Sequence, residues 1–283
     1  MLRLVLLTAL VLLLPARAYA QSVVFLEGSR GFRSRLVEDG QVVGERAGLF
    51  VPSSHGLVEV RVVAREATQP WCREGVNSHT QAPDPVAHFE HVMARRAGSR
   101  WVSVVAEAAA MEGELDARTR VLGVVGSRVF LTAHTASSSC GAHPDWSTEF
   151  VVFDVETMAP VNLEEETDVQ RWAQHHIPER TCEAGCNCEP FTTLVLYPRF
   201  TAAGELRAAG VYLWREESYV CTSGEWGAYF SSVLVPAAAP AAWVRAYQPL
   251  LADARIAMEG QRGRLLGATS VNDELRGAFV RRR

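Results

Sequence analysis

Alternation of hydrophobic and polar residues is the dominant pattern along the chain, and it predicts strands. Between Leu57 and Arg65, the valines at positions 58, 60 and 62 share one face of an extended segment, which is the period of a half-buried strand. Short polar turns separate most of the similar runs, so the pattern favours antiparallel meanders. The other predicted strands are residues 101–105, 121–132, 150–155, 191–197, 209–214 and 229–235.

Helical signals interrupt the strands at three places. Asp84 is a suitable cap and Pro85 a suitable first residue for a helix that runs to Gly98. Its apolar stripe consists of Val86, Phe89, Val92 and Met93.

The second and third helices are expected at 162–177 and 241–255. The second begins with acids at positions 164, 165 and 166, where the helix dipole favours them, and ends before Pro178. The third is broken at Pro249. The predicted fold class is therefore α+β, with a mostly antiparallel sheet, about three helices packed on it, and disulfide bonds.

The first 20 residues have the three parts of an export signal. Arg3 precedes an apolar run of 11 residues, Leu4–Leu14, and small residues occupy positions 18 and 20 before a cleavage point. The run is shorter than the roughly 20 residues that cross a bilayer as a helix. We expect cleavage after Ala20, a mature chain that begins at Gln21 with no membrane span, and a secreted or periplasmic location.

Charge and composition exclude several function classes. All 28 basic residues are arginine, so the chain offers no lysine for a Schiff base or a phosphate-binding loop. The mature part has 26 arginines against 32 acids, a net charge of about −6. This balance does not suggest nucleic acid as a partner, and no cofactor-binding motif is present.

The even number of cysteines predicts a disulfide framework in an exported chain. Cys182, Cys186 and Cys188 are also spaced as metal ligands are, with His175 and His176 just before them. An export pathway exposes thiols to oxidant first, so disulfides are the favoured interpretation and no metal is predicted. The six cysteines are Cys72, Cys140, Cys182, Cys186, Cys188 and Cys221.

Candidate catalytic residues do not form a recognisable motif. His88 and His91 lie three residues apart around Glu90, whereas zinc proteases place two histidines four apart on a helix. No Gly-x-Ser-x-Gly sequence is present. A pair of carboxylates assembled in space would not be visible in the sequence, so a secreted hydrolase is kept as an alternative. A structural envelope protein is the other alternative.

One stretch of the chain resembles a known family. Gly141-Ala142-His143 follows a strand, and the sequence Phe153-Asp154-Val155-Glu156-Thr157 then precedes Leu163 and a helix. This order resembles the extracytoplasmic domain of unknown function of the lysozyme-sensing anti-sigma factor and of peptidoglycan-deacetylase-associated modules. The chain departs from that pattern at Cys140 and at Met158, where the family has glycine.

The resemblance implies a binding domain without catalytic residues of its own. Its partner would be an envelope protein, such as a lysozyme-type enzyme, or a glycan. The binding residues would lie at and just after the glycine turn: Gly141, His143, Asp145 and Trp146. His143 is either a ligand contact or a turn residue whose ring bonds the backbone nearby.

These observations divide the chain into four parts. After the signal come a strand-rich part with one helix at 21–98 and the family-like α+β domain at 99–258. Residues 259–283, which contain a glycine-rich stretch and three terminal arginines, are expected to be a flexible tail.

Overall fold

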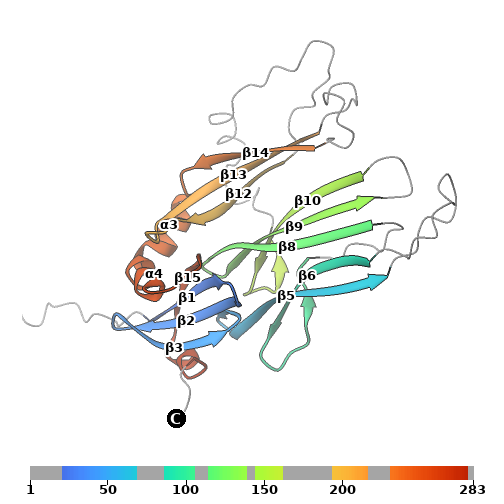
Figure 1. Ribbon diagram of the computed structural model, residues 1–283. Coiled ribbons are helices and arrows are strands. Elements are labelled where there is room, and N and C mark those ends of the chain that lie inside the picture. Colours follow the sequence, from blue (N-terminus) through green and yellow to red (C-terminus); the bar gives the residue numbers. More distant parts are fainter. Residues whose placement is uncertain are drawn as a thin grey trace, which may run out of the picture.

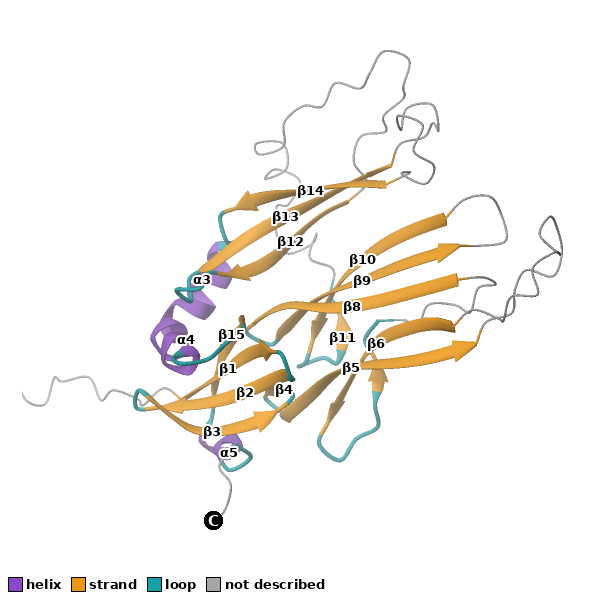
Figure 2. Ribbon diagram, viewed as in Figure 1, coloured by secondary structure: helices purple, strands orange, loops and turns teal. Residues whose placement is uncertain are grey.

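The protein is described from a computed structural model over residues 21–68, 86–105, 114–138, 144–161, 193–215 and 230–279, and most of these residues are in strands (Figures 1 and 2). The strands are β1 Gln21–Gly28, β2 Gly31–Glu38, β3 Gln41–Ala47, β4 Leu49–Ser53, β5 Gly56–Thr68, β6 Val86–Arg96, β7 Val102–Ser103, β8 Glu114–Val125, β9 Arg128–Ser138, β10 Pro144–Asp154, β11 Ala159–Pro160, β12 Thr193–Phe200, β13 Leu206–Arg215, β14 Phe230–Ala237 and β15 Arg264–Val271. The helical segments are α3 Ala241–Tyr247, η3 Gln248–Leu250, α4 Leu251–Met258 and α5 Asp273–Arg276.

A mixed sheet of 12 strands forms most of this part of the chain, and β8 is its branch point. Near its start β8 runs parallel to β6, with Asp116 opposite His88. Near its end it runs parallel to β15, with Val124 opposite Gly267. We call residues 118–123 of β8, between these two pairings, the fork.

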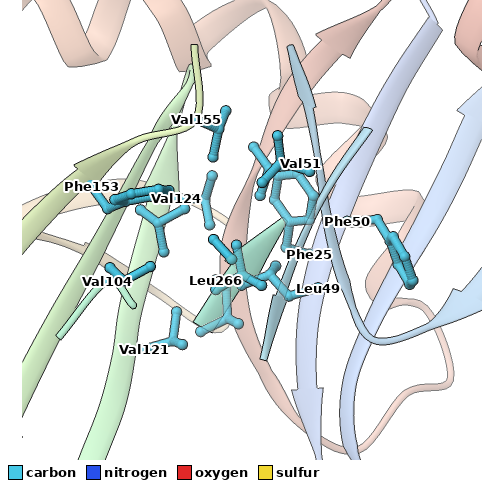
Figure 3. Packing of buried hydrophobic residues seen from close by; sticks show 14 of the residues in the cluster. Phe25, Leu49, Phe50, Val51, Val104, Val121, Val124, Phe153, Val155 and Leu266 are labelled. Carbon is cyan, nitrogen blue, oxygen red and sulfur yellow. The ribbon is translucent and has the colours of Figure 1, made fainter. Parts of the chain in front are cut away.

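From the fork towards the C-terminal end of β8, the sheet separates into two layers. The β5 layer consists of β4, β5 and β6, and the β8 layer has the order β10-β9-β8-β15-β1-β2-β3. The main hydrophobic core lies between them, and Figure 3 shows side chains from β8, β10 and β15 meeting those from β1 and β4. Phe25, Leu49, Val51, Val124 and Leu266 are fully buried there. The alternating valines of β5 therefore lie on the face of that strand that packs against this core.

The outer face of the β8 layer is covered by two further elements. Helix α4 packs on β1 and β15, where Ala254 and Ala257 are fully buried. The three-stranded sheet β12-β13-β14 and Trp243 of α3 cover the outer face of β8, β9 and β10. The Trp243 ring meets the Phe130 ring edge to face at 4.9 Å between centroids. Both apolar faces of the β8 layer are thus buried along much of its length.

The helix expected at 84–98 is wrong, because residues 86–96 form β6. This strand pairs with β5 without interruption, from Val58 opposite Arg96 to Thr68 opposite Val86. The apolar residues fit both periods, but Val92 and Ala94, two positions apart, are the ones that enter the core. Strand pairing over the whole segment outweighs the local Asp-Pro helix signal.

The flexible tail expected at 259–283 is also wrong for residues 264–271, which form β15 in the centre of the sheet. This strand pairs with β1 on one side and with β8 on the other. Gly267 has φ 137°, and a Cβ there would lie 2.0 Å from the carbonyl oxygen of Val124. The glycine-rich sequence is explained by this close approach of two backbones and not by flexibility.

The fold class is corrected accordingly. The described part is dominated by a mixed sheet, and its helices are the 241–258 segment, which η3 interrupts at Pro249, and the one-turn α5. The run at 121–132 contains the β8–β9 turn, with Gly126 at φ 60°. The expected helix at 162–177 and all six cysteines lie outside the described residues. One sheet includes strands from both sides of residue 98, where we had placed a domain boundary.

Candidate functional site

Five strands end together on the side of the molecule away from the helices, to the right in Figure 1. There, β5 ends at Thr68, β6 begins at Val86, and β8 begins at Glu114 opposite Ser138 of β9, which in turn faces Pro144 of β10. We call this edge the open end. Residues 139–143, which connect β9 to β10 and include Gly141 and His143, lie outside the described residues.

The strand register places residues from all five strands in one row across the open end. Trp146 of β10 is opposite Ala136 of β9, and Ala136 is opposite Asp116 of β8. Asp116 is opposite His88 of β6, which is opposite Glu66 of β5. Because directly paired residues of a sheet share a face, this row connects the predicted binding strand to the histidine of β6.

An open hollow of about 500 Å³ lies over part of this row. Its wall carries charged side chains from three strands, Arg65, Glu66, His88, Glu90, Asp116 and Arg118. The neighbouring row adds His134, whose Nδ1 lies 3.1 Å from Thr148 Oγ1. The open end is therefore a polar surface with several hydrogen-bonding groups in register.

Four of the six charged side chains of the hollow form two pairs. His88 Nδ1 lies 3.2 Å from Glu66 Oε1, and both side chains are more than half exposed. Arg118 Nε lies 3.0 Å from Asp116 Oδ2, and the hydrogen bond that Arg118 donates to this carboxylate raises the pKa of Arg118. Exposed pairs of this kind contribute little to stability, so their role at the surface is not explained by folding.

Glu90 of β6 contacts the fork and has a structural role. Its Oε2 accepts the backbone N–H of Thr119 at 2.9 Å, and the Thr119 hydroxyl donates to the carbonyl of Glu90 at 3.0 Å. Arg264 of β15 donates to the carbonyls of Val121 and Leu122. Side chains of the two diverging neighbours thus replace the strand that is missing beside β8, which satisfies its backbone groups.

His88 and His91 do not form a metal pair. On a strand, residues three apart point to opposite faces, and the Nδ1 of His91 is buried without a hydrogen-bond partner among the described residues. The described part contains no cluster of three or more histidine, cysteine or acidic residues that would hold a metal ion. The acids at positions 164–166 lie outside it.

The motif that carries the family resemblance has a structural explanation. Phe153 and Val155 are buried in the core, and Asp154 Oδ1 accepts the N–H of Glu156 at 2.9 Å in the turn after β10. The backbone N–H of Met158 donates to Asp154 O at 2.8 Å, and Met158 has φ 59°. This conformation favours glycine, which is the residue that the family has at this position.

The predicted binding residues are only partly placed. Asp145 and Trp146 are in β10, opposite Ser137 and Ala136, but their side chains are outside the described part. His134, Arg118 and Asp116 were not predicted as site residues. Alternation in β8 and β9 is visible in the sequence, but nothing there shows that β6 lies beside β8.

Comparison of the chain with protein-family models, curated proteins and solved structures finds no match. The resemblance to the extracytoplasmic domain therefore stays a prediction. No helix of the described part has the length and apolar character needed to cross a bilayer.

Proposed function

We propose that this chain is an exported, non-catalytic binding domain of the cell envelope that recognises a protein, such as a lysozyme-type enzyme, or a glycan. The ligand contacts the open end, where the strand that carries Asp145 and Trp146 lies in one sheet with His88 and Asp116. The motif resemblance and the export signal support the class of partner and the location.

The row across five strands is the observation that carries this proposal. Two regions that are separate in the sequence, residues 144–148 and 86–90, are brought to one edge by continuous pairing through β8 and β9. A sheet end that holds polar residues of several strands in one register suits recognition, because less backbone freedom is lost on binding than in an unstructured segment.

The state of the acids favours binding over hydrolysis. Glu66 is engaged by His88, Asp116 by Arg118, and Glu90 by the backbone of Thr119. A general acid or base needs a carboxylate that is free to exchange a proton with substrate. None of these three carboxylates is free in this sense, because each already has a hydrogen-bond or ion-pair partner.

The test measures binding of the purified mature chain to a lysozyme-type enzyme and to soluble peptidoglycan fragments by biolayer interferometry. Arg118→Ala removes a cation whose side chain is 73% exposed at the open end, and we expect it to weaken binding about tenfold if the residue is an anchor. Trp146→Ala is expected to weaken binding by about 2 kcal/mol.

Arg207→Ala is the matched control. Arg207 of β13 is paired at 3.1 Å with Glu205, which is two residues away, as Asp116 is from Arg118. Glu205 directly precedes β13, and Arg207 lies on the three-stranded sheet. It should leave the affinity unchanged. Hydrolysis of a glycan or peptide that is lost on changing one acid or histidine, with folding intact by circular dichroism, would contradict the proposal.

A further inference from the structure

A second hollow lies where the β1–β2 turn meets the loop between α4 and β15. Its volume is about 210 Å³, less than half that of the hollow at the open end. Leu26 and Met258 form its apolar wall, and Ser29, Gln261, Arg33 and Arg262 supply hydrogen-bond donors. The site is separate from the open end in both the sheet and the chain.

The electrostatic balance of this hollow is positive. Glu27 is the acid in its wall, and its Oε2 is held by Arg264 at 2.7 Å. Arg33 lies 3.6 Å from Glu45, but Glu45 is held more closely by Arg35, at 2.8 Å. Arg262 has no ion pair or hydrogen bond among the described residues. Two guanidinium groups are therefore available where the nearest carboxylates are already engaged.

Two chain segments around the hollow pack closely against each other, most closely at Gly263. A Cβ on Gly263 would lie 2.5 Å from the carbonyl oxygen of Glu27, and a Cβ on Gly28 would lie 3.5 Å from the carbonyl oxygen of Arg262. The end of β1 and the 261–263 loop are thus in direct backbone contact. This contact places the loop that carries Arg262 against the end of β1, where Leu26 is opposite Arg33 of β2.

We propose that this hollow binds a small organic anion, with a carboxylate or phosphate head group attached to a short apolar chain. Guanidinium groups match the paired oxygens of both head groups and bind them with charge-assisted hydrogen bonds. Leu26 and Met258 cover the apolar part of the ligand. A neutral ligand of the same length would leave the two arginines without an anion.

The test is calorimetric titration of the full mature chain with sodium hexanoate and with butyl phosphate, with 1-hexanol as the neutral probe, at constant ionic strength. We expect saturable binding of at least one anion and weaker or no binding of 1-hexanol. Arg262→Gln and Arg33→Gln should each weaken anion binding by about tenfold, because each removes a charge-assisted hydrogen bond.

Arg30→Gln is the matched control, because Arg30 is exposed in the same β1–β2 turn but does not line the hollow. It should bind the anion as the parent chain does, and a thermal melt of each variant reports whether it folds. Equal affinity for 1-hexanol, or an affinity that Arg262→Gln leaves unchanged while folded, overturns the proposal. Neither result bears on lysozyme or glycan binding at the open end.

Discussion

The two ends of the double-layered sheet are held together in different ways. At the end away from the open end, the turn after β10 contacts the turn between β4 and β5: Glu156 accepts the Ser54 N–H at 2.9 Å and the Ser54 hydroxyl at 2.6 Å. Arg96 of β6 also donates to the Glu156 carbonyl. These bonds join the β5 layer to the β8 layer. We call this region the closed end.

At the open end, the two ion pairs that the described residues form lie along the sheet. His88 contacts the facing residue of the neighbouring strand, and Arg118 contacts a residue of its own strand. Since both pairs are largely exposed, they contribute little to the free energy of unfolding. The comparison shows that polar contacts at the closed end join the two layers and serve folding, whereas the two exposed ion pairs at the open end contribute little to stability.

The largest expected effect is at Gly267, on the closed side of the fork. In Gly267→Ala the new Cβ meets the Val124 carbonyl, and alanine is strained at φ 137°. We expect the free energy of unfolding to fall by at least about 3 kcal/mol, measured by urea denaturation. The reason is that β15 and β8 would have to separate.

Gly126→Ala is the control for this substitution. Gly126 also has a positive φ, 60°, but nothing lies within 4 Å of a Cβ there. Its cost should be about 1 kcal/mol, the strain of the turn alone. Equal effects of the two substitutions would show that β15 does not pack against β8 as described.

An intermediate effect is expected at the fork. Glu90→Ala leaves the Thr119 N–H without its acceptor, and a partly buried unsatisfied donor costs about 1–3 kcal/mol. Glu90→Gln keeps an acceptor oxygen and should recover most of the stability. Glu66→Ala, which removes only the exposed pair with His88, should change the free energy of unfolding by less than about 0.5 kcal/mol. If Glu66→Ala cost as much as Glu90→Ala, the open end would be structural too.

The structure confirms predictions that rest on a local pattern, among them the helix expected at 241–255 with its break at Pro249. The period of Leu57 to Arg65 appears as β5, and the segment from Phe150 appears at the end of β10. The two segments that we assigned wrongly, 86–96 and 264–271, are the partners of β8 in its parallel pairings. Parallel pairing connects segments far apart in the chain, and the hydrophobic period within each segment does not predict it. Gly267 looked like a loop residue, but the carbonyl that requires it belongs to β8.

The candidate site could be predicted only in part for the same reason. Asp145 and Trp146 were selected from a motif, and His88 was judged as a helical residue. Their common row depends on the order β6-β8-β9-β10, which the chain order does not reveal. The role of Glu90 likewise depends on the gap beside β8, where a side chain replaces a strand.

The smallest effect is expected at Met158, in the turn of the closed end. Its φ of 59° is unfavourable for any residue with a Cβ, but its side chain is partly buried against the main core. Met158→Gly relieves about 1 kcal/mol of backbone strain and loses a similar amount of apolar burial, so we expect a net change within about 1 kcal/mol.

The sharper measurement at this position compares Met158→Gly with Met158→Ala, since both remove the side-chain packing and only alanine keeps the strain. At an ordinary strand position such as the exposed Val102, alanine should be the more stable of the two replacements by about 0.5–1 kcal/mol, because glycine loses more conformational freedom on folding. At Met158 we expect the opposite order, with glycine more stable by about 1 kcal/mol in urea denaturation. The same order at both positions would mean that the turn after β10 does not hold residue 158 in the left-handed conformation. The reversed order would show that glycine, the family's residue, suits this turn for a conformational reason.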